Sequence, residues 1–181
     1  MTFKEYVQAL YQDIPMNLCI GLLLVLCLGV VTIIGFYGWK RGWRKIGGLL
    51  LVEYIFMLLC STVVFRATAE VRKYDWEPFW SYKAIEEGRA ELLPENIMNV
   101  VVFVPVGLLL ASAFRYIKWW QVLGIGCLMS MSIEILQFVL KRGFAETDDV
   151  MHNTLGCVLG YMLVKGSRCM VKGFRRRIEA L

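Results

Sequence analysis

Five long hydrophobic blocks dominate the pattern of apolar and polar positions along the chain. They lie near residues 16–38, 46–65, 97–114, 121–140 and 149–165. A transmembrane helix needs about 20 mostly apolar residues, and each block approaches or meets that length. The pattern therefore predicts an all-α fold, in which about five transmembrane helices form a bundle and residues 1–181 make a single membrane domain.

The composition agrees with a membrane environment. Hydrophobic residues make up 58% of the chain, compared with roughly 45–50% in soluble globular proteins. Of the 6 cysteines, none lies in a polar outer loop and none forms a CxxC pair, which favours buried thiols over disulfides or a zinc site. The net charge of +5 is divided among segments, so no basic domain face for nucleic acid is expected.

The distribution of Lys and Arg predicts the orientation. The segments between the first and second blocks, between the third and fourth blocks, and in the tail 166–181 are strongly basic, with Glu179 as their only acid. The loop 66–93 carries most of the acidic residues. The positive-inside rule therefore places the N-terminus and the 66–93 loop outside, and the C-terminus and its basic tail in the cytoplasm.

The 66–93 loop also contains a run of aromatic and acidic residues at 75–82, DWEPFWSY. Two interpretations are open. The run is an anchor at the outer membrane surface, or it is a lid that contacts a substrate.

Polar and small residues recur at helical spacing in the last three blocks. The faces are Asn96, Asn99, Phe103 and Gly107 in the third block; Ser130, Glu134 and Gln137 in the fourth; and Asp149, Asn153, Gly156 and Gly160 in the fifth. With the predicted orientation, their polar residues converge near the outer leaflet. Gly156 and Gly160 form a GxxxG spacing that lets helix backbones approach closely, and we interpret Gly107, Gly156 and Gly160 as helix-packing positions.

Glu134 is the strongest single candidate for a functional residue. An isolated carboxylate in the bilayer costs at least about 2.5 kcal/mol, so Glu134 needs a partner, water or a proton. It either pairs with Arg142 or an Asn amide to orient helices, or it serves a ligand or a proton. Glu53 lies nearer the cytoplasmic end, where we expect a structural contact with Arg44 or Lys45.

The acids before the fifth block have two interpretations. Glu146, Asp148 and Asp149 have the oxygen ligands that a divalent cation prefers, but consecutive acids at a helix start also cap free N–H groups. His152 is the only histidine, and a lone His is more often a helix-interface donor than a metal ligand. We therefore predict no metal site and no cofactor.

The chain resembles the VanZ-like family of bacterial membrane proteins. The resemblance rests on NIMN at 96–99, FVPVG at 103–107, SIEILQ at 132–137, Arg142, DDV at 148–150, NTLG at 153–156, and GY at 160–161. Arg66 and the Pro78-Phe79 pair extend it, so it covers about 60–165. It implies a multi-pass protein of the bacterial cell membrane. The founding member is associated with resistance to the glycopeptide antibiotic teicoplanin, whereas Glu146-Thr147 departs from the acidic–aliphatic pair common in the family.

The leading hypothesis is a cell-envelope protein with an outer-leaflet polar site that affects glycopeptide susceptibility and thus antibiotic resistance. The site would bind membrane lipid, a lipid-linked cell-wall precursor, a glycopeptide or an envelope enzyme. Its expected binding residues are Arg66, Asn96, Asn99, Glu134, Gln137, Arg142, Asp148, Asp149 and Asn153.

An intramembrane enzyme is the alternative. It would act on a lipid headgroup, with Glu134 or Asp149 as the catalytic acid or base. An ion-coupled transporter is a weaker third hypothesis, because five spans without an internal repeat leave little for alternating access.

Overall fold

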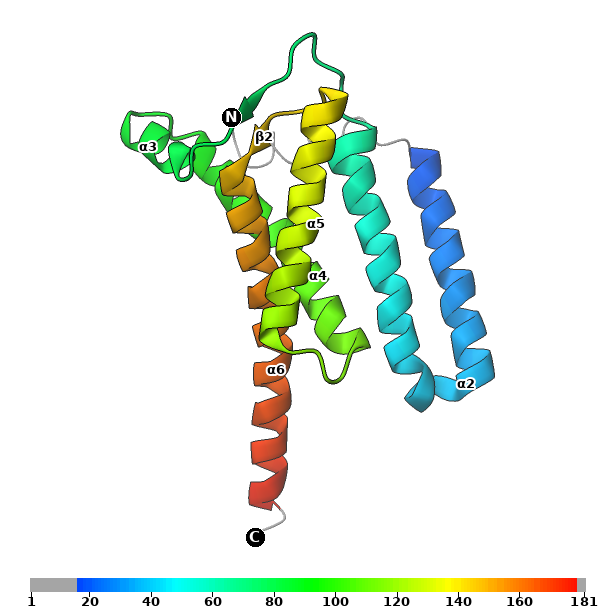
Figure 1. The fold of residues 1–181 in the computed structure, drawn as a ribbon. Coiled ribbons are helices and arrows are strands. Elements are labelled where there is room, and N and C mark those ends of the chain that lie inside the picture. The colour runs from blue at the N-terminus through cyan, green and yellow to red at the C-terminus, as the bar shows by residue number, and fades with distance from the viewer. Residues whose placement is uncertain (1–15, 179–181) are drawn as a thin grey trace.

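A computed structural model describes residues 16–178 and shows a predominantly helical protein (Figure 1). Its helices are α2 (Met16–Leu59), the π-helix η1 (Cys60–Val64), α3 (Trp80–Glu86), α4 (Leu92–Ala113), α5 (Trp119–Leu140) and α6 (Thr147–Ile178). The strands β1 (Tyr74–Asp75) and β2 (Ala145–Glu146) form a small parallel pair.

Helix α2 turns back on itself and forms two antiparallel arms, dark blue and cyan in Figure 1. A Cβ added at Gly29 would lie 2.6 Å from Cδ2 of Leu49, whereas a straight helix would separate these residues by about 30 Å. Gly42 likewise lies beside Ile33. The reversal falls in the glycine-rich segment 35–42, where the sequence offers little resistance to a sharp bend.

Three helices are long and apolar enough to cross a membrane among the described residues: Gly42–Val64, Leu92–Ala113 and Trp119–Leu140. They match the expected blocks at 46–65, 97–114 and 121–140, which confirms the prediction of an α-helical membrane protein. The helix of the third block begins at Leu92, ahead of the apolar block, and Pro94 lies in its first turn. The first block appears as a shorter apolar helix, Ile20–Gly35, and the fifth block lies within α6.

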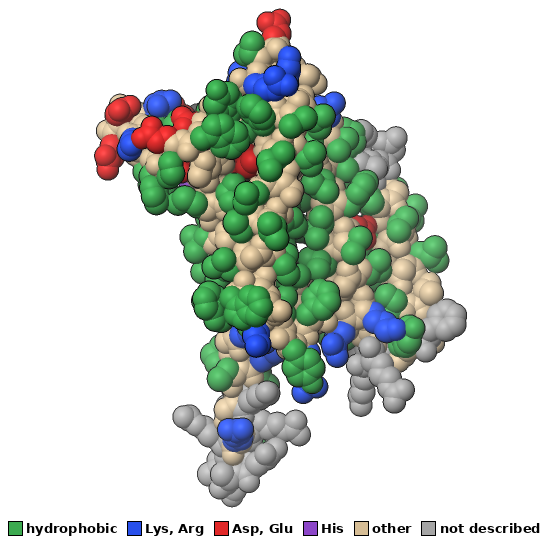
Figure 2. Space-filling model, in the orientation of Figure 1, with side chains coloured by type: hydrophobic (Ala, Val, Ile, Leu, Met, Phe, Trp, Pro, Cys, Tyr) green, Lys and Arg blue, Asp and Glu red, His purple; other side chains and the backbone are tan. Residues whose placement is uncertain are grey.

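The molecule has chemically different ends. We name the end that holds α3, β1 and β2 the acidic end, and the opposite end, with Arg44, Arg115 and Lys165, the basic end. Figure 2 shows acidic side chains around α3, hydrophobic ones across the middle, and basic ones at the lower ends of the helices. The tryptophans Trp43, Trp119 and Trp120 are exposed near the basic end, which suits the headgroup layer.

The segment between η1 and α4 is joined to the turn between α5 and α6. Tyr74 pairs with Ala145 and Asp75 with Glu146 in the parallel ladder. The N–H of Ala69 also donates to the carbonyl of Lys141 at 2.8 Å. These two connections therefore form one layer across the acidic end of the bundle.

The closest helix contact is the crossing of α4 and α6. A Cβ added at Gly156 or Gly160 would overlap the carbonyl oxygen of Val100 or Val104, and one at Gly107 would overlap that of Cys157. Backbone therefore rests on backbone, which no larger residue permits. Helix α5 packs on the same region, because a Cβ at Gly126 would lie 2.9 Å from Cβ of Cys157.

We predict that Gly156→Val destabilises the protein by about 1–3 kcal/mol or more, because the α4 carbonyl cannot move aside. Gly166→Ala is the matched control on α6, since nothing lies within 4 Å of an added Cβ there. This control should leave stability unchanged or raise it, because Ala favours the helix. Thermal unfolding in detergent measures both. A G156V protein as stable as wild type would contradict the close crossing.

Candidate functional site

The α4–α6 crossing brings polar side chains of three helices together near the acidic end. Nδ2 of Asn99 on α4 donates to Oδ1 of Asp149 on α6 at 2.5 Å. One turn further along α6, Nδ2 of Asn153 donates to Oγ of the buried Ser130 on α5 at 2.8 Å. The polar faces expected in the last three blocks thus meet inside the bundle.

Glu134 is almost fully buried, with 3% of its surface exposed. Its Oε2 accepts a hydrogen bond from the backbone N–H of Glu146 at 3.0 Å, so it binds the turn before α6. The pairing with Arg142 that the sequence suggested is not formed. Arg142 donates instead to the carbonyl oxygens of Val63, at 3.0 Å, and Val64. The last carbonyls of a helix lack intrahelical partners, and Arg142 satisfies those of η1.

Arg66 supplies the cation of this region. Its guanidinium lies against Gly143, where an added Cβ would overlap it and where φ is +88°. Its charge acts on the carboxylates of Glu95, Glu134 and Asp149. Among the residues that the structure describes, the one ion pair is that of Lys83 with Glu77, so Arg66 approaches these three acids without pairing directly with a described one.

A cavity of about 240 Å³ lies between the second arm of α2, α4 and α5. Its polar lining includes Ser61, Thr62, Arg66, Asn99, Glu134, Gln137 and Asn153, and most of the remaining lining is apolar. Nε2 of Gln137 donates to the carbonyl of Thr62 at 3.0 Å, but its buried Oε1 has no partner. Buried polar atoms are normally satisfied, so this oxygen indicates room for a donor in the cavity.

Asp148 and Asn96 hold α3 in place. Asp148 is fully buried, and its carboxylate accepts the N–H groups of Phe79 at 2.6 Å and Ser81 at 3.0 Å, and the hydroxyl of Ser81 at 2.5 Å. Nδ2 of Asn96 donates to the same hydroxyl at 3.1 Å. Asp148 therefore caps α3 from another segment, because the backbone at Phe79 is left-handed and α3 lacks a side-chain cap of its own.

The aromatic run 75–82 lies over the start of α6. Nε1 of Trp80 donates to Oε2 of Glu146 at 3.0 Å, and the Tyr82 hydroxyl shares a 2.7 Å hydrogen bond with Nε2 of His152. Trp76, Phe79 and Tyr82 are nevertheless exposed. The run thus closes the acidic end over polar residues and presents aromatic surface outward, so the anchor and lid interpretations both fit its position.

Two expectations about acidic residues need comment. Glu53 contacts neither Arg44 nor Lys45 by an ion pair within the described part of the chain, and its Oε2 is buried without a partner. Lys45 lies eight residues before Glu53 in the same helix, so the two residues are about 12 Å apart along the helix axis, which explains why they do not pair. Among the described residues, no group of three or more Asp, Glu, His or Cys is placed to hold a metal ion. Asp148 is turned toward α3 and away from Glu146.

Sequence reasoning missed the contribution of α2 and of the loop. Ser61 and Thr62 line the cavity, and Ser81 joins Asp148 to Asn96. Ser and Thr hardly alter the hydropathy of an apolar block. The one available signal for Ser61 and Thr62 was that these two polar residues are adjacent near the end of the second block. Nothing in the sequence indicated Ser81.

Burial raises the pKa of Glu146 to about 8, and the neighbouring charge of Asp149 adds to the increase. The Trp80 indole opposes it by donating to the carboxylate, while Glu134 and Glu95 add smaller repulsions. Glu146 lies in the turn before α6 and can therefore change charge near neutral pH.

These features define an α-helical membrane protein with a small polar cavity near one end of its bundle. The VanZ/LLP1 family model matches residues 22–170, so the chain belongs to the VanZ/LLP1 family. Protein VanZ of Enterococcus faecium is 38% identical over 69 residues, which cover 38% of this chain and 43% of that relative. The chain thus spans less than half of the curated relative it matches. No solved structure matches the chain.

The raised pKa of Glu146 predicts a pH dependence of stability. Its folded pKa of about 8 exceeds the ordinary 4.5, so the folded state favours the protonated form. The resulting stabilisation is complete below pH 4.5 and is lost as the pH rises through about 8.

We therefore expect the melting temperature of Glu146→Gln to fall less than that of wild type between pH 4.5 and about 8, because glutamine does not ionise and still accepts from Trp80. Glu86→Gln, at an exposed position of α3, is the control and should keep the wild-type slope. Equal slopes for E146Q and wild type would refute the assignment.

Proposed function

We propose that this protein is a multi-pass protein of the bacterial cell membrane whose polar cavity binds the headgroup of a lipid-linked cell-wall precursor, and that it thereby alters glycopeptide susceptibility. One observation carries the proposal: the cavity presents Arg66 and the unpartnered Oε1 of Gln137 beside the buried Glu134. Burying such groups without hydrogen-bond partners costs free energy, so a polar ligand or water is needed to supply the missing hydrogen bonds.

The size of the cavity favours part of a lipid headgroup over a whole antibiotic. Its volume is about 240 Å³, whereas drug-sized ligands need roughly 300–1,000 Å³ and a glycopeptide is larger still. A diphosphate or sugar group fits this space, and a guanidinium binds phosphate oxygens well. An effect on teicoplanin would then be indirect, through the precursor that the antibiotic targets or through an envelope enzyme.

The arrangement of the helices supports five crossings with the acidic end outside. The two arms of α2, α4, α5 and α6 follow one another up and down through the bundle (Figure 1). The start of α2 lies at the acidic end and the last turns of α6 at the basic end. The positive-inside rule assigns the basic end to the cytoplasm, which puts the cavity near the outer leaflet.

A lipid-headgroup enzyme is the second candidate. The favouring observation is that Glu134, which is buried, and Asp149, which is partly buried, lie near Arg66, so that two carboxylates and a phosphate-binding cation are in one place. Release of a product from the purified protein with lipid substrate would favour this function, and binding without turnover would favour the first.

We predict that Arg66→Gln and Glu134→Gln each weaken binding of the polyprenyl-diphosphate-linked precursor by about 10-fold or more, the usual effect of losing a charged hydrogen bond. Glutamine at 134 keeps an acceptor for the N–H of Glu146, so the fold is preserved. Binding is measured by native mass spectrometry, and teicoplanin susceptibility is compared in cells expressing each variant.

Ser132→Ala is the matched control on α5. Its hydroxyl donates to the carbonyl of Leu128 in its own helix, and the residue is exposed. This variant should bind like wild type. The proposal fails if E134Q and R66Q retain wild-type binding and susceptibility while folding normally.

The proposed orientation predicts opposite labelling of two cysteines by a membrane-impermeant maleimide. The native Cys169 is exposed on α6 at the basic end and should react only after the cells are permeabilised. Glu86→Cys in a Cys169→Ser background should react in intact cells, because Glu86 is exposed on α3. C169S alone controls for the remaining thiols. Labelling of position 86 only after permeabilisation would invert the topology.

A further inference from the structure

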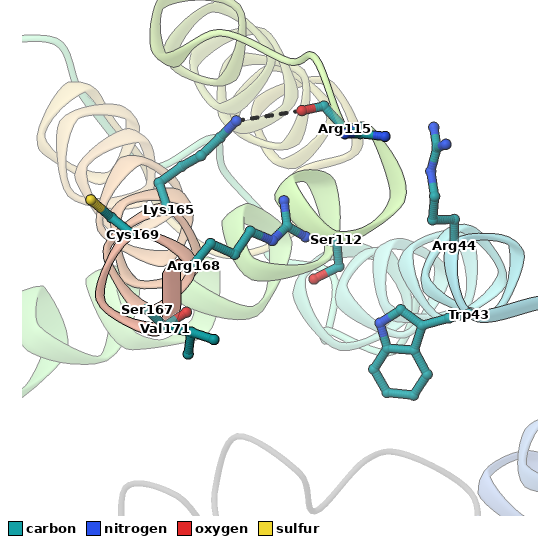
Figure 3. Close-up of a pocket in the computed structure, with 9 residues that line it drawn as sticks. All are labelled: Trp43, Arg44, Ser112, Arg115, Lys165, Ser167, Arg168, Cys169 and Val171. Carbon is teal, nitrogen blue, oxygen red and sulfur yellow. Dashed lines mark hydrogen bonds between the residues drawn. The ribbon is translucent and has the colours of Figure 1, made fainter. Parts of the chain in front are cut away.

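A second cavity, of about 670 Å³, opens at the basic end, opposite the proposed precursor site. Figure 3 shows its lining. The residues are Trp43, Arg44, Ser112, Arg115, Lys165, Ser167, Arg168, Cys169 and Val171. They come from the second arm of α2, the end of α4 and the turn after it, and α6. Because three segments distant in sequence build it, this is a concave site between helices.

The cavity contains four cationic side chains and no acidic one. Arg44 and Arg115 line the same side of the cavity, and the guanidinium group of Arg168 reaches toward Ser112 (Figure 3). None of these cations forms an ion pair with an acid in the described part of the chain. Like charges that face one another repel, so a bound anion would stabilise this arrangement.

Hydrogen bonds to the backbone keep two of the cations at the cavity. Nε of Arg44 approaches the carbonyl of Ala113 at 3.5 Å, and Nζ of Lys165 approaches that of Arg115 at 3.5 Å, the dashed line in Figure 3. These contacts use one donor of each side chain and leave others for a ligand. The hydroxyl of Ser112 donates to Leu108 and still offers its lone pairs.

An apolar groove adjoins the charged cavity. It has a volume of about 410 Å³, shares Arg44 and Arg115 with the larger cavity, and is otherwise lined by Phe114, Tyr116, Ile117, Gln121 and Ile125. Phe114 and Tyr116 are exposed. A charged cavity that continues into an apolar groove at the membrane boundary matches a molecule with an anionic head and hydrocarbon tails, and it matches free phosphate less well.

We propose that the basic-end cavity binds an anionic phospholipid of the adjacent leaflet. The phosphate lies among Arg44, Arg115 and Arg168, and an acyl chain follows the groove past Phe114 toward Ile125. This lipid joins α2, the α4–α5 turn and α6 at the basic end. The site is independent of the precursor site, since it lies at the opposite end and uses none of its residues.

The test measures phospholipid retained by the full-length protein from mixed micelles, using dioleoylphosphatidylglycerol and dioleoylphosphatidylcholine as probes and native mass spectrometry as the readout. Wild type should retain the anionic dioleoylphosphatidylglycerol in preference to dioleoylphosphatidylcholine. Arg168→Glu should reduce this retention by about fivefold or more, because each basic residue near an anionic lipid contributes on the order of 1 kcal/mol. Inorganic phosphate at the same concentration should not compete, which separates a lipid from a free anion.

Arg176→Glu is the matched control, since it makes the same charge change on an exposed position of α6 about two turns beyond Arg168 and outside the cavity lining. It should keep retention within about twofold of wild type. Arg168→Lys preserves the charge and should therefore keep most of the wild-type retention of the anionic lipid. Equal losses in R168E and R176E would reduce the effect to surface charge, and unchanged retention in a folded R168E protein would overturn the site. Competition by phosphate would reassign it to a free anion.

Discussion

The backbone contact between α4 and α6 is the constraint on which the rest of the structure depends. Gly107, Gly156 and Gly160 remove the side chains that would hold the two helices apart. In lipid, no hydrophobic driving force brings two apolar helices together, so close packing and hydrogen bonds between helices must supply the attraction. The crossing supplies both, because at this separation Asn99 reaches Asp149 directly.

The same crossing explains how so many polar groups are tolerated within the bundle. Asn153 is satisfied by Ser130 on α5, Glu134 by the N–H of Glu146, and Asp148 by the capped start of α3. Each partner comes from a different segment, so the network fixes the loops of the acidic end as well as the helices. Three buried side-chain atoms of the described residues have no partner: Oε2 of Glu53, Nδ1 of His152 and Oε1 of Gln137. Of these three residues, Gln137 is the one that lines the polar cavity.

Sequence predicted the elements better than the pairings. Hydropathy located the three long apolar helices, and the 3.6-residue period put Asn99, Glu134 and Asn153 on interior faces. Periodicity specifies a direction around one helix and contains no information on the partner, so it left Arg142 open as a partner of Glu134, and the structure gives each of these residues a different partner. The gap between the first two hydrophobic blocks also predicted the reversal of α2. The capping of α3 by Asp148 depends on a tertiary contact between distant segments, which local patterns do not encode.

The two ends of the molecule differ in the sign of the charge that needs compensation. Near the cavity at the acidic end, the carboxylates of Glu134 and Asp149 lie among neutral hydrogen-bond donors, and Arg66 is the cation whose charge acts on both. At the basic end, cations converge in an open cavity without acids, and compensation must come from outside the chain. An enclosed site selects by shape and hydrogen bonding, whereas an open cationic site selects by charge. In the functions that we propose, discrimination among headgroups therefore belongs to the cavity at the acidic end, and retention of an anionic lipid belongs to the basic end.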